Sequence, residues 1–107
     1  MLIYNITYNV DDTIHEEWYE WIKNHIPKIL STGKFLEAKF SKVIIEEEMG
    51  GQTYSLQLKV ESKATLDKYY AENAEQLRQL GLVKFADKVL TFRTELEIID
   101  EYRVNFN

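Results

Sequence analysis

His25 is the residue of this sequence with the clearest capacity for chemistry. It lies in the run Trp18–Tyr–Glu–Trp21–Ile–Lys–Asn–His25–Ile26–Pro27, on the predicted apolar stripe of a helix. An imidazole titrates near neutral pH, so its neutral form could remove a proton from an acidic carbon or a phenol. Haem ligation by the same ring would compete with that role. The structural alternative is a core histidine that hydrogen-bonds a carbonyl or caps a kink before Pro27.

Arg93 is the second candidate for a chemical role. It alternates with Glu95 along a predicted final strand, where the two could form a cross-strand or intersubunit ion pair. Arg93 could instead hold an anionic ligand. If His25 acts as a base, Arg93 or a tyrosine hydroxyl would stabilise the anion that results.

The other polar groups predict no metal site. His15 falls in the first turn of the same helix beside Glu16 and Glu17, so we expect it to be exposed. It is ten residues from His25, whereas residues that share a helix face lie about three or four apart. The run Glu46–Glu47–Glu48 resembles neither a calcium loop nor a catalytic carboxylate pair, and favours a solvated hairpin end.

Composition limits the class of protein. The 107 residues fit one domain. A net charge of −5 without a Lys/Arg cluster argues against nucleic acid and against an anionic membrane as partners. Because the chain has no cysteine, it has no disulfide and no thiolate nucleophile or metal ligand. The first residues show no basic and apolar leader, so we expect a cytoplasmic protein.

Hydrophobic periodicity predicts the elements around His25. Alternating apolar residues over 2–10 predict a strand. The helix is expected to begin near Thr13, to bend or restart at Pro27, and to end at Thr32–Gly33.

A hairpin is predicted next. Over residues 34–48 the alternation slips by one, which predicts a long strand with a bulge near Ser41–Lys42. Residues 49–51 form a turn, and residues 54–60 alternate again.

The last part of the domain is predicted to be a helix and a strand. Ser62 caps the helix, whose apolar positions are Leu66, Tyr69, Tyr70, Asn73, Leu77 and Leu80. Gly81 is expected to end it, with an irregular turn over 82–86 and a final strand over 89–99.

This order predicts an α+β, ferredoxin-like βαββαβ domain over residues 1–99, with a four-stranded antiparallel sheet and two helices on one face. Residues 100–107 are a C-terminal tail. The first and third strands would be central, and their helix-covered face would carry Tyr4, Ile6, Tyr8, Tyr54, Leu56 and Leu58. The opposite face would carry Ile3, Asn5, Thr7, Asn9, Thr53, Ser55 and Gln57, flanked by Thr91, Arg93 and Glu95. That face has few charges for a solvated surface, so a second copy is expected to cover it and form a homodimer.

Several motifs together resemble a known family. They are Trp18–x–x–Trp21–x–x–x–His25–Ile26–Pro27, Thr32–Gly33–x–Phe35, Glu47–Glu48–x–Gly50–Gly51–x–Thr53–Tyr54–Ser55 and Phe92–Arg93–Thr94. Up to Ile99 the chain resembles the bacterial family named domain of unknown function 4286. The resemblance implies a ferredoxin-like protein of the dimeric α/β-barrel type, without an established activity. Members often carry a histidine where this chain has Asn73, so the resemblance does not support a role for two imidazoles.

The resemblance also implies a place for a ligand. Proteins similar in shape, among them monooxygenases without prosthetic groups, muconolactone-isomerase-like enzymes and haem-degrading enzymes, hold ligands between the helices and the sheet. The corresponding lining here would be Tyr4, Tyr8, Trp21, His25, Tyr54, Tyr70 and Asn73.

Two functions stay open. The first is a homodimeric protein that binds a small organic molecule or has a structural role, without catalysis. The second is a cofactor-independent enzyme, monooxygenase-like or isomerase-like, with His25 as its base. The second requires a cavity of about 300 Å³ or more beside His25. Neither function calls for a cofactor, haem aside.

Overall fold

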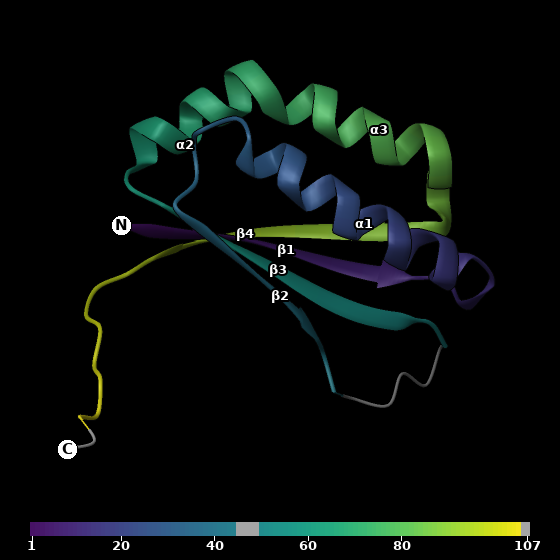
Figure 1. The fold of residues 1–107 in the computed structure, drawn as a ribbon, viewed down its shortest axis with the longest axis horizontal. Coiled ribbons are helices and arrows are strands. Elements are labelled where there is room, and N and C mark those ends of the chain that lie inside the picture. The colour runs from purple at the N-terminus through teal and green to yellow at the C-terminus, as the bar shows by residue number, and fades with distance from the viewer. Residues whose placement is uncertain (45–49, 106–107) are drawn as a thin grey trace.

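Two layers make up the structure, a sheet and a set of helices on one of its faces (Figure 1). The computed structural model describes residues 1–44 and 50–105. The sheet is four-stranded with the order β2-β3-β1-β4, and all neighbours are antiparallel. Its strands are β1 (Leu2–Val10), β2 (Glu37–Lys42), β3 (Gln52–Val60) and β4 (Val89–Glu97). The expected α+β, ferredoxin-like arrangement is confirmed.

The helical layer consists of two long helical segments. The first is α1 (His15–Leu30), which follows a 3₁₀ turn, η1 (Asp12–Ile14). The second contains α2 (Lys63–Tyr69), the π-helical turn η2 (Tyr70–Ala74) and α3 (Glu75–Phe85). A last 3₁₀ turn, η3 (Ala86–Lys88), leads into β4.

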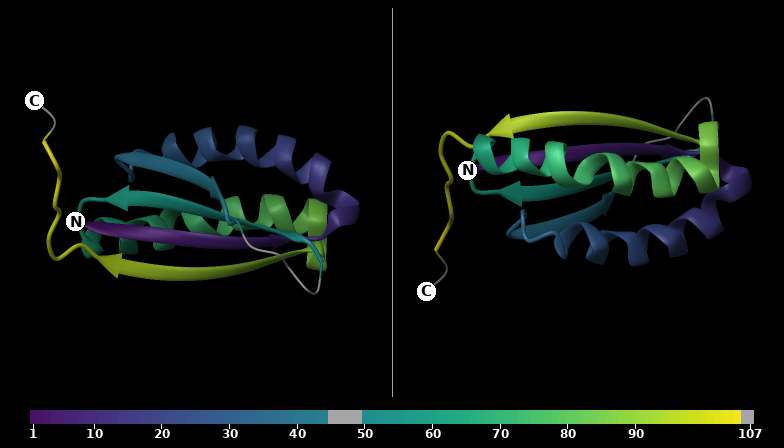
Figure 2. Two further views of the ribbon diagram at one scale, coloured as in Figure 1. Left: turned by 90° about the horizontal axis from the view of Figure 1, so that it is seen from below. Right: turned by 90° about the horizontal axis from the view of Figure 1, so that it is seen from above.

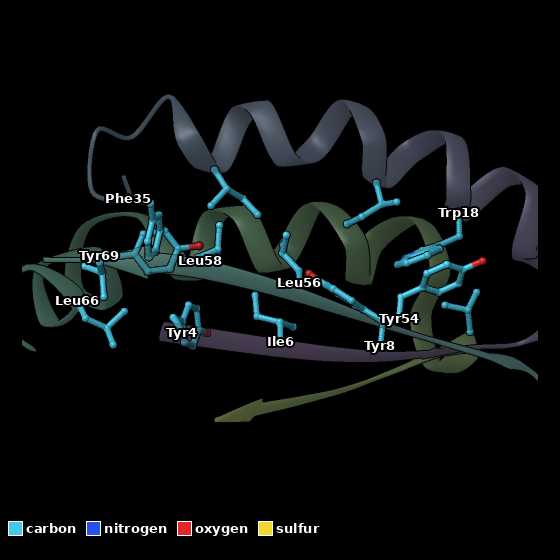
Figure 3. Packing of buried hydrophobic residues seen from close by; sticks show 14 of the residues in the cluster. Tyr4, Ile6, Tyr8, Trp18, Phe35, Tyr54, Leu56, Leu58, Leu66 and Tyr69 are labelled. Carbon is cyan, nitrogen blue, oxygen red and sulfur yellow. The ribbon is translucent and has the colours of Figure 1, made fainter. Parts of the chain in front are cut away.

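The core lies between the sheet and the helices. Along the central strands β1 and β3, alternate side chains point to the helices and are buried, as predicted for Tyr4, Ile6, Tyr8, Tyr54, Leu56 and Leu58 (Figure 3). The apolar stripe of α1 covers them with Trp18, Ile22 and Ile29. Period-two strands and a period-3.6 helix therefore bury the residues that their patterns indicate.

Helix α1 has the predicted boundaries but passes through its proline. Asp11 accepts a hydrogen bond from the backbone N–H of Thr13 at 2.8 Å, and Gly33 ends the segment with a φ of 76°. Pro27 lies inside one continuous helix. The lost hydrogen bond would fall on the carbonyl of Lys23, an exposed residue, where water can take its place. The expectation of a second helical segment was therefore wrong.

Strand β2 is shorter than predicted. It spans Glu37–Lys42 and pairs with β3 residue for residue, so the pairing leaves no extra residue for a bulge near Ser41–Lys42. The rest of the expected strand falls partly on residues 45–48, outside the described residues. In the turn that follows, Gly51 has a φ of 83°, and an added Cβ would lie 3.0 Å from the carbonyl oxygen of Val10.

The second helical segment runs past Gly81, contrary to the prediction. Ser62 caps it by accepting from the backbone N–H of Thr65 at 3.2 Å, as expected. The π-helical turn η2 then widens one turn and rotates the helix that follows. As a result Leu77 and Phe85 face the sheet, whereas Leu80 is exposed. The segment ends only at Ala86, whose φ is 49°.

The side chains of strand β4 point to the opposite faces of the sheet from those predicted. Its register with β1 places Thr91 beside Tyr8, Arg93 beside Ile6 and Glu95 beside Tyr4, so these polar residues face the helical layer. The outer face of β4 instead carries Leu90, Phe92, Thr94 and Leu96. Seen from above, the helices lie over the other strands and leave β4 along the uncovered edge (Figure 2). Polar side chains on the helix side of β4 therefore stay in contact with solvent.

Candidate functional site

A cavity of about 270 Å³ opens between α1, the segment from η2 to η3, and the strands β1 and β4. Its lining includes five of the predicted ligand residues, namely Tyr4, Tyr8, Trp21, His25 and Arg93. The volume is slightly below the expected 300 Å³. It suits a ligand at the small end of the usual range for organic molecules.

His25 borders the cavity without any hydrogen bond among the described residues. Its Nδ1 atom is fully buried and has no partner there, so the carbonyl expected in the structural alternative is missing. Burial lowers the pKa of His25 to about 4, and the positive charge of Lys28 acts in the same direction. The imidazole is therefore neutral at pH 7 and has an unused polar atom.

Trp21 and the second helical segment hold the His25 ring. The indole of Trp21 stacks on the imidazole with ring centroids 4.3 Å apart and planes 18° from parallel. Gly81 lets α3 approach, because an added Cβ would lie 3.1 Å from Cη2 of Trp21. Phe85 meets Trp21 edge to face at 5.4 Å. These contacts make one wall of the cavity aromatic.

Three tyrosines contribute hydroxyl groups to the floor of the cavity. Within residues 1–44 and 50–105, no hydrogen bond involves the hydroxyl of Tyr4, Tyr8 or Tyr69. Burial raises the pKa of Tyr69 to about 12 and raises the pKa of Tyr4 and Tyr8 as well. At neutral pH all three therefore carry protons and can donate a hydrogen bond to a ligand.

Arg93 supplies the positive charge at the cavity. No hydrogen bond or ion pair to its side chain exists in the described part of the chain. The expected pairing of Arg93 with Glu95 is absent there, because Glu95 accepts from Lys63 at 2.7 Å and from Tyr70 at 3.1 Å. Both residues face the helices and not the outer face of the sheet, as their register with β1 shows.

The remaining predicted ligand residues lie elsewhere. The hydroxyl of Tyr70 is bound to Glu95, and the Asn73 amide oxygen accepts from Lys34 at 3.1 Å. Tyr54 lies near the start of α1, where its hydroxyl is 2.6 Å from Nε2 of His15. His15 is therefore half-buried and hydrogen-bonded, not exposed as predicted.

Part of the cavity lining was not among the predicted ligand residues. Ala74, Leu77, Gly81, Leu82 and Phe85 line the cavity. The spacing of Ala74, Leu77, Gly81 and Phe85 is itself helical, and this was the available signal. This spacing was not recognised because the helix was expected to end at Gly81. The glycine instead lies inside the helix and allows α3 to approach Trp21 closely.

Among the residues that the structure describes, no group of three or more His, Cys, Asp or Glu side chains is placed to hold a metal ion. No helix among them combines the length and apolarity needed to cross a membrane.

Solved structures confirm the fold at low sequence identity. A dimeric ferredoxin-like protein from an uncultured marine organism is 11% identical with a TM-score of 0.66, over 94% of this chain and 97% of that chain. At3g17210 from Arabidopsis thaliana is 19% identical with a TM-score of 0.66, over 99% and 100%. HapK from Hahella chejuensis is 10% identical with a TM-score of 0.67, over 98% and 100%.

The family comes from the sequence itself. No curated protein matches the chain. Residues 1–99 match the family model described as domain of unknown function (DUF4286). That range covers the whole sheet and both helical segments, including every residue that lines the cavity. The chain is a member of the DUF4286 family.

Proposed function

We propose that this protein binds a small organic molecule in the cavity beside His25. One observation carries the proposal: unpaired polar atoms from separate elements converge on an otherwise apolar space. Among the described residues they are the imidazole of His25, which borders the cavity and whose Nδ1 is buried without a partner, and the hydroxyls of Tyr4, Tyr8 and Tyr69. A buried polar atom without a partner costs about 1–3 kcal/mol, which applies to Nδ1 of His25, while the three tyrosine hydroxyls are free to hydrogen-bond a ligand.

A fragment screen tests this proposal. Binding of small aromatic and aliphatic compounds would be measured by protein-observed NMR and by tryptophan fluorescence. Ala74 is half-buried and lines the cavity, so Ala74→Leu should weaken binding at least about tenfold by filling the space. Ala71 is exposed in the same helical turn, and Ala71→Leu is the matched control that should leave binding unchanged. If no compound binds in a way that distinguishes the two variants, the proposal is wrong.

We further propose that two copies pair through the outer face of the sheet. On that face Leu90, Phe92 and Leu96 of β4 are 54%, 61% and 45% exposed. The central polar residues already bond to one another, since Ser55 donates to Asn5 at 2.6 Å and Asn9 donates to Thr53 at 3.2 Å. Covering them therefore leaves few polar groups unpaired. The marine ferredoxin-like protein is described as dimeric, which supports a dimer but does not specify the face that pairs.

Light scattering tests the dimer. The wild-type chain should give twice the mass of one chain, and Phe92→Glu should give the monomer because it buries a charge in the apolar contact. Ala71→Glu adds the same charge on the helical side, where the residue is exposed, and should remain a dimer. Charge introduced at Asn5 or Gln57 should act like Phe92→Glu. A monomeric wild-type chain contradicts this part of the proposal.

Proton transfer by His25 is a second candidate function. It is favoured by the His25 ring, which has no hydrogen-bond partner among the described residues and borders the cavity. With a pKa of about 4, His25 is a weak base, so a bound substrate would have to raise that pKa for the ring to take a proton. The test follows exchange of carbon-bound hydrogen for deuterium in a ligand found by the screen. Exchange that is equally fast with His25→Gln excludes the catalytic role and leaves binding.

Two further proposals concern the location of the protein in the cell and the bounds of its functional domain. We infer a cytoplasmic location of a bacterial cell, in keeping with a chain that has no cysteine. We treat residues 1–99 as the functional domain and residues 100–107 as a tail outside it.

A further inference from the structure

We propose that the ligand of this cavity is an anion, a carboxylate on a flat apolar body, and that Arg93 holds its charge. This inference rests on the proposed binding function and names the class of ligand. It starts from a contrast in charge. The chain has 18 acidic and 13 basic residues, yet the cavity lining includes Arg78 and Arg93 and, among the described residues, no Asp or Glu.

Arg93 is the cation that is free to act. The charge of Arg93 acts on the nearby carboxylate of Glu75, and Glu95 lies two residues along the same strand, but both carboxylates already bind other side chains. Glu95 binds Lys63 and Tyr70, while Glu75 binds Arg78 at 2.9 Å and Gln79 at 3.0 Å. Arg78 is thereby neutralised by its own neighbour on α3. The guanidinium of Arg93 has no such partner among the described residues.

Arg93 lies on the same side of the sheet as the tyrosines that line the cavity. It lies beside Ile6 in the register of β4 with β1, on the side of the sheet that the helices cover. Its positive charge acts on Tyr4, Tyr8 and Tyr69, where it opposes the rise in pKa that burial causes. An anion held by Arg93 would therefore lie within reach of protonated hydroxyl groups that can donate to it.

A carboxylate suits this set of groups. The guanidinium has a planar fork of N–H donors that fits the two oxygens of a carboxylate, and the tyrosines add further donors. Nothing in the described lining offers a carboxylate to pair with a ligand amine. The Trp21 and Phe85 rings and the side chain of Leu77 form the apolar part of the wall, which suits a flat hydrocarbon body.

Matched triplets of compounds test the inference. Each triplet presents one flat aromatic body, such as naphthalene, as the carboxylic acid, the primary amide and the aminomethyl compound. Binding to the full-length chain at pH 7.5 would be measured by calorimetry and by protein-observed NMR. The acid should bind about tenfold more tightly than the amide, and the amine should bind most weakly.

Two arginine variants identify the cause of that preference. Arg93→Gln should bind acid and amide equally, and circular dichroism would check that this exposed edge residue can be replaced without loss of fold. Arg103→Gln is the control and should keep the preference, because Arg103 is exposed in the C-terminal tail and does not line the cavity. An amide that binds as tightly as the acid, or a preference that survives Arg93→Gln, overturns the anion inference but leaves the binding function intact. If no triplet binds in any form, the inference fails together with the proposed binding.

Discussion

The two histidines lie at different places along the same helix–sheet interface and differ in their hydrogen bonding. At the start of α1, His15 stacks between Tyr19 and Tyr54, with ring centroids 5.8 Å and 5.7 Å away, and its Nε2 is 2.6 Å from the Tyr54 hydroxyl. Nearly three turns later, His25 stacks on Trp21 but has no hydrogen-bond partner among the described residues. His15 is therefore hydrogen-bonded by a neighbouring side chain, whereas His25 borders the cavity with its Nδ1 unpaired.

The neighbouring strands explain this difference. The His15 end lies over β2 and β3, where Phe40 stacks on Tyr54 at 5.3 Å and fills the space with a ring. The His25 end lies toward β1 and β4, where the corresponding positions carry Thr91 and Arg93. Polar side chains on an edge strand cannot fill an apolar space, so a cavity remains. Unused polar groups therefore mark the proposed binding site better than the mere presence of a histidine.

The largest expected effect distinguishes the two tryptophans. Trp18 is 1% exposed in the core, so Trp18→Ala should lower the free energy of unfolding by about 3–5 kcal/mol. Trp21 is half-buried beside the existing cavity, so Trp21→Ala should cost roughly 1–2 kcal/mol. Urea denaturation followed by circular dichroism measures both. Equal losses would mean that the two ends are packed alike.

The second prediction concerns the loss of stability at low pH. An unfolded histidine binds a proton below its ordinary pKa of 6.5, whereas the buried His25 binds one only near pH 4. Between these values the unfolded state holds more protons, so the free energy of unfolding should fall by up to about 3 kcal/mol as the pH falls from 6.5 to 4. Above pH 6.5 this contribution is fully present.

His25→Leu isolates that effect. The variant should lose the part of the acid sensitivity that belongs to His25. At pH 7.5 it should be as stable as the wild type, or more stable by up to about 1 kcal/mol, because the buried unpaired nitrogen is gone. Stability curves from pH 4 to pH 7.5 for both proteins check this. Curves that run parallel through the window would show that His25 is not the group responsible.

Two Tyr→Phe variants test the comparison, because each removes a single hydroxyl group. Tyr54→Phe removes the hydroxyl that binds His15 and should cost about 1 kcal/mol. Tyr8→Phe removes a hydroxyl that has no protein partner among the described residues, so stability should change by less than about 0.5 kcal/mol. Ligand binding should respond in the reverse order, with Tyr8→Phe weakening it and Tyr54→Phe leaving it unchanged. Thermal denaturation and the fragment assay together measure the contrast.

The smallest expected effect is at Gly81. Glycine inside a helix costs about 1 kcal/mol relative to alanine, but the added Cβ would lie 3.1 Å from Trp21 and push the indole away. For Gly81→Ala these two effects should nearly cancel in the free energy of unfolding. The fluorescence of Trp21 should nevertheless shift, which comparison with a Trp18→Phe background can resolve. A loss above about 2 kcal/mol would mean that the indole cannot move.

Much of the fold could be predicted because its patterns are local. The alternation along β1 and β3 and the stripe of α1 directly determine which side chains are buried. The cap at Ser62 and the left-handed Gly33 mark helix boundaries for equally local reasons. Of the predicted ligand residues, those on β1 and α1 reached the cavity, since both elements have clear periodicity.

The predictions that failed depended on contacts between distant segments. Nothing local to 89–97 says which face of β4 meets the helices, because both of its faces are largely exposed at the edge of the sheet. The register with β1 decides that Arg93 faces the cavity, while Leu90, Phe92 and Leu96 face outward. The π-helical turn likewise rotates α3 and brings Gly81 against Trp21.

The sequence alone therefore determined the order of elements, the apolar layer between sheet and helices, and the family. Only the tertiary structure decided that His15 finds a partner and His25 does not. The physical reason is that periodicity specifies which side chains leave water, whereas hydrogen-bond partners and empty space depend on which distant atoms arrive beside them.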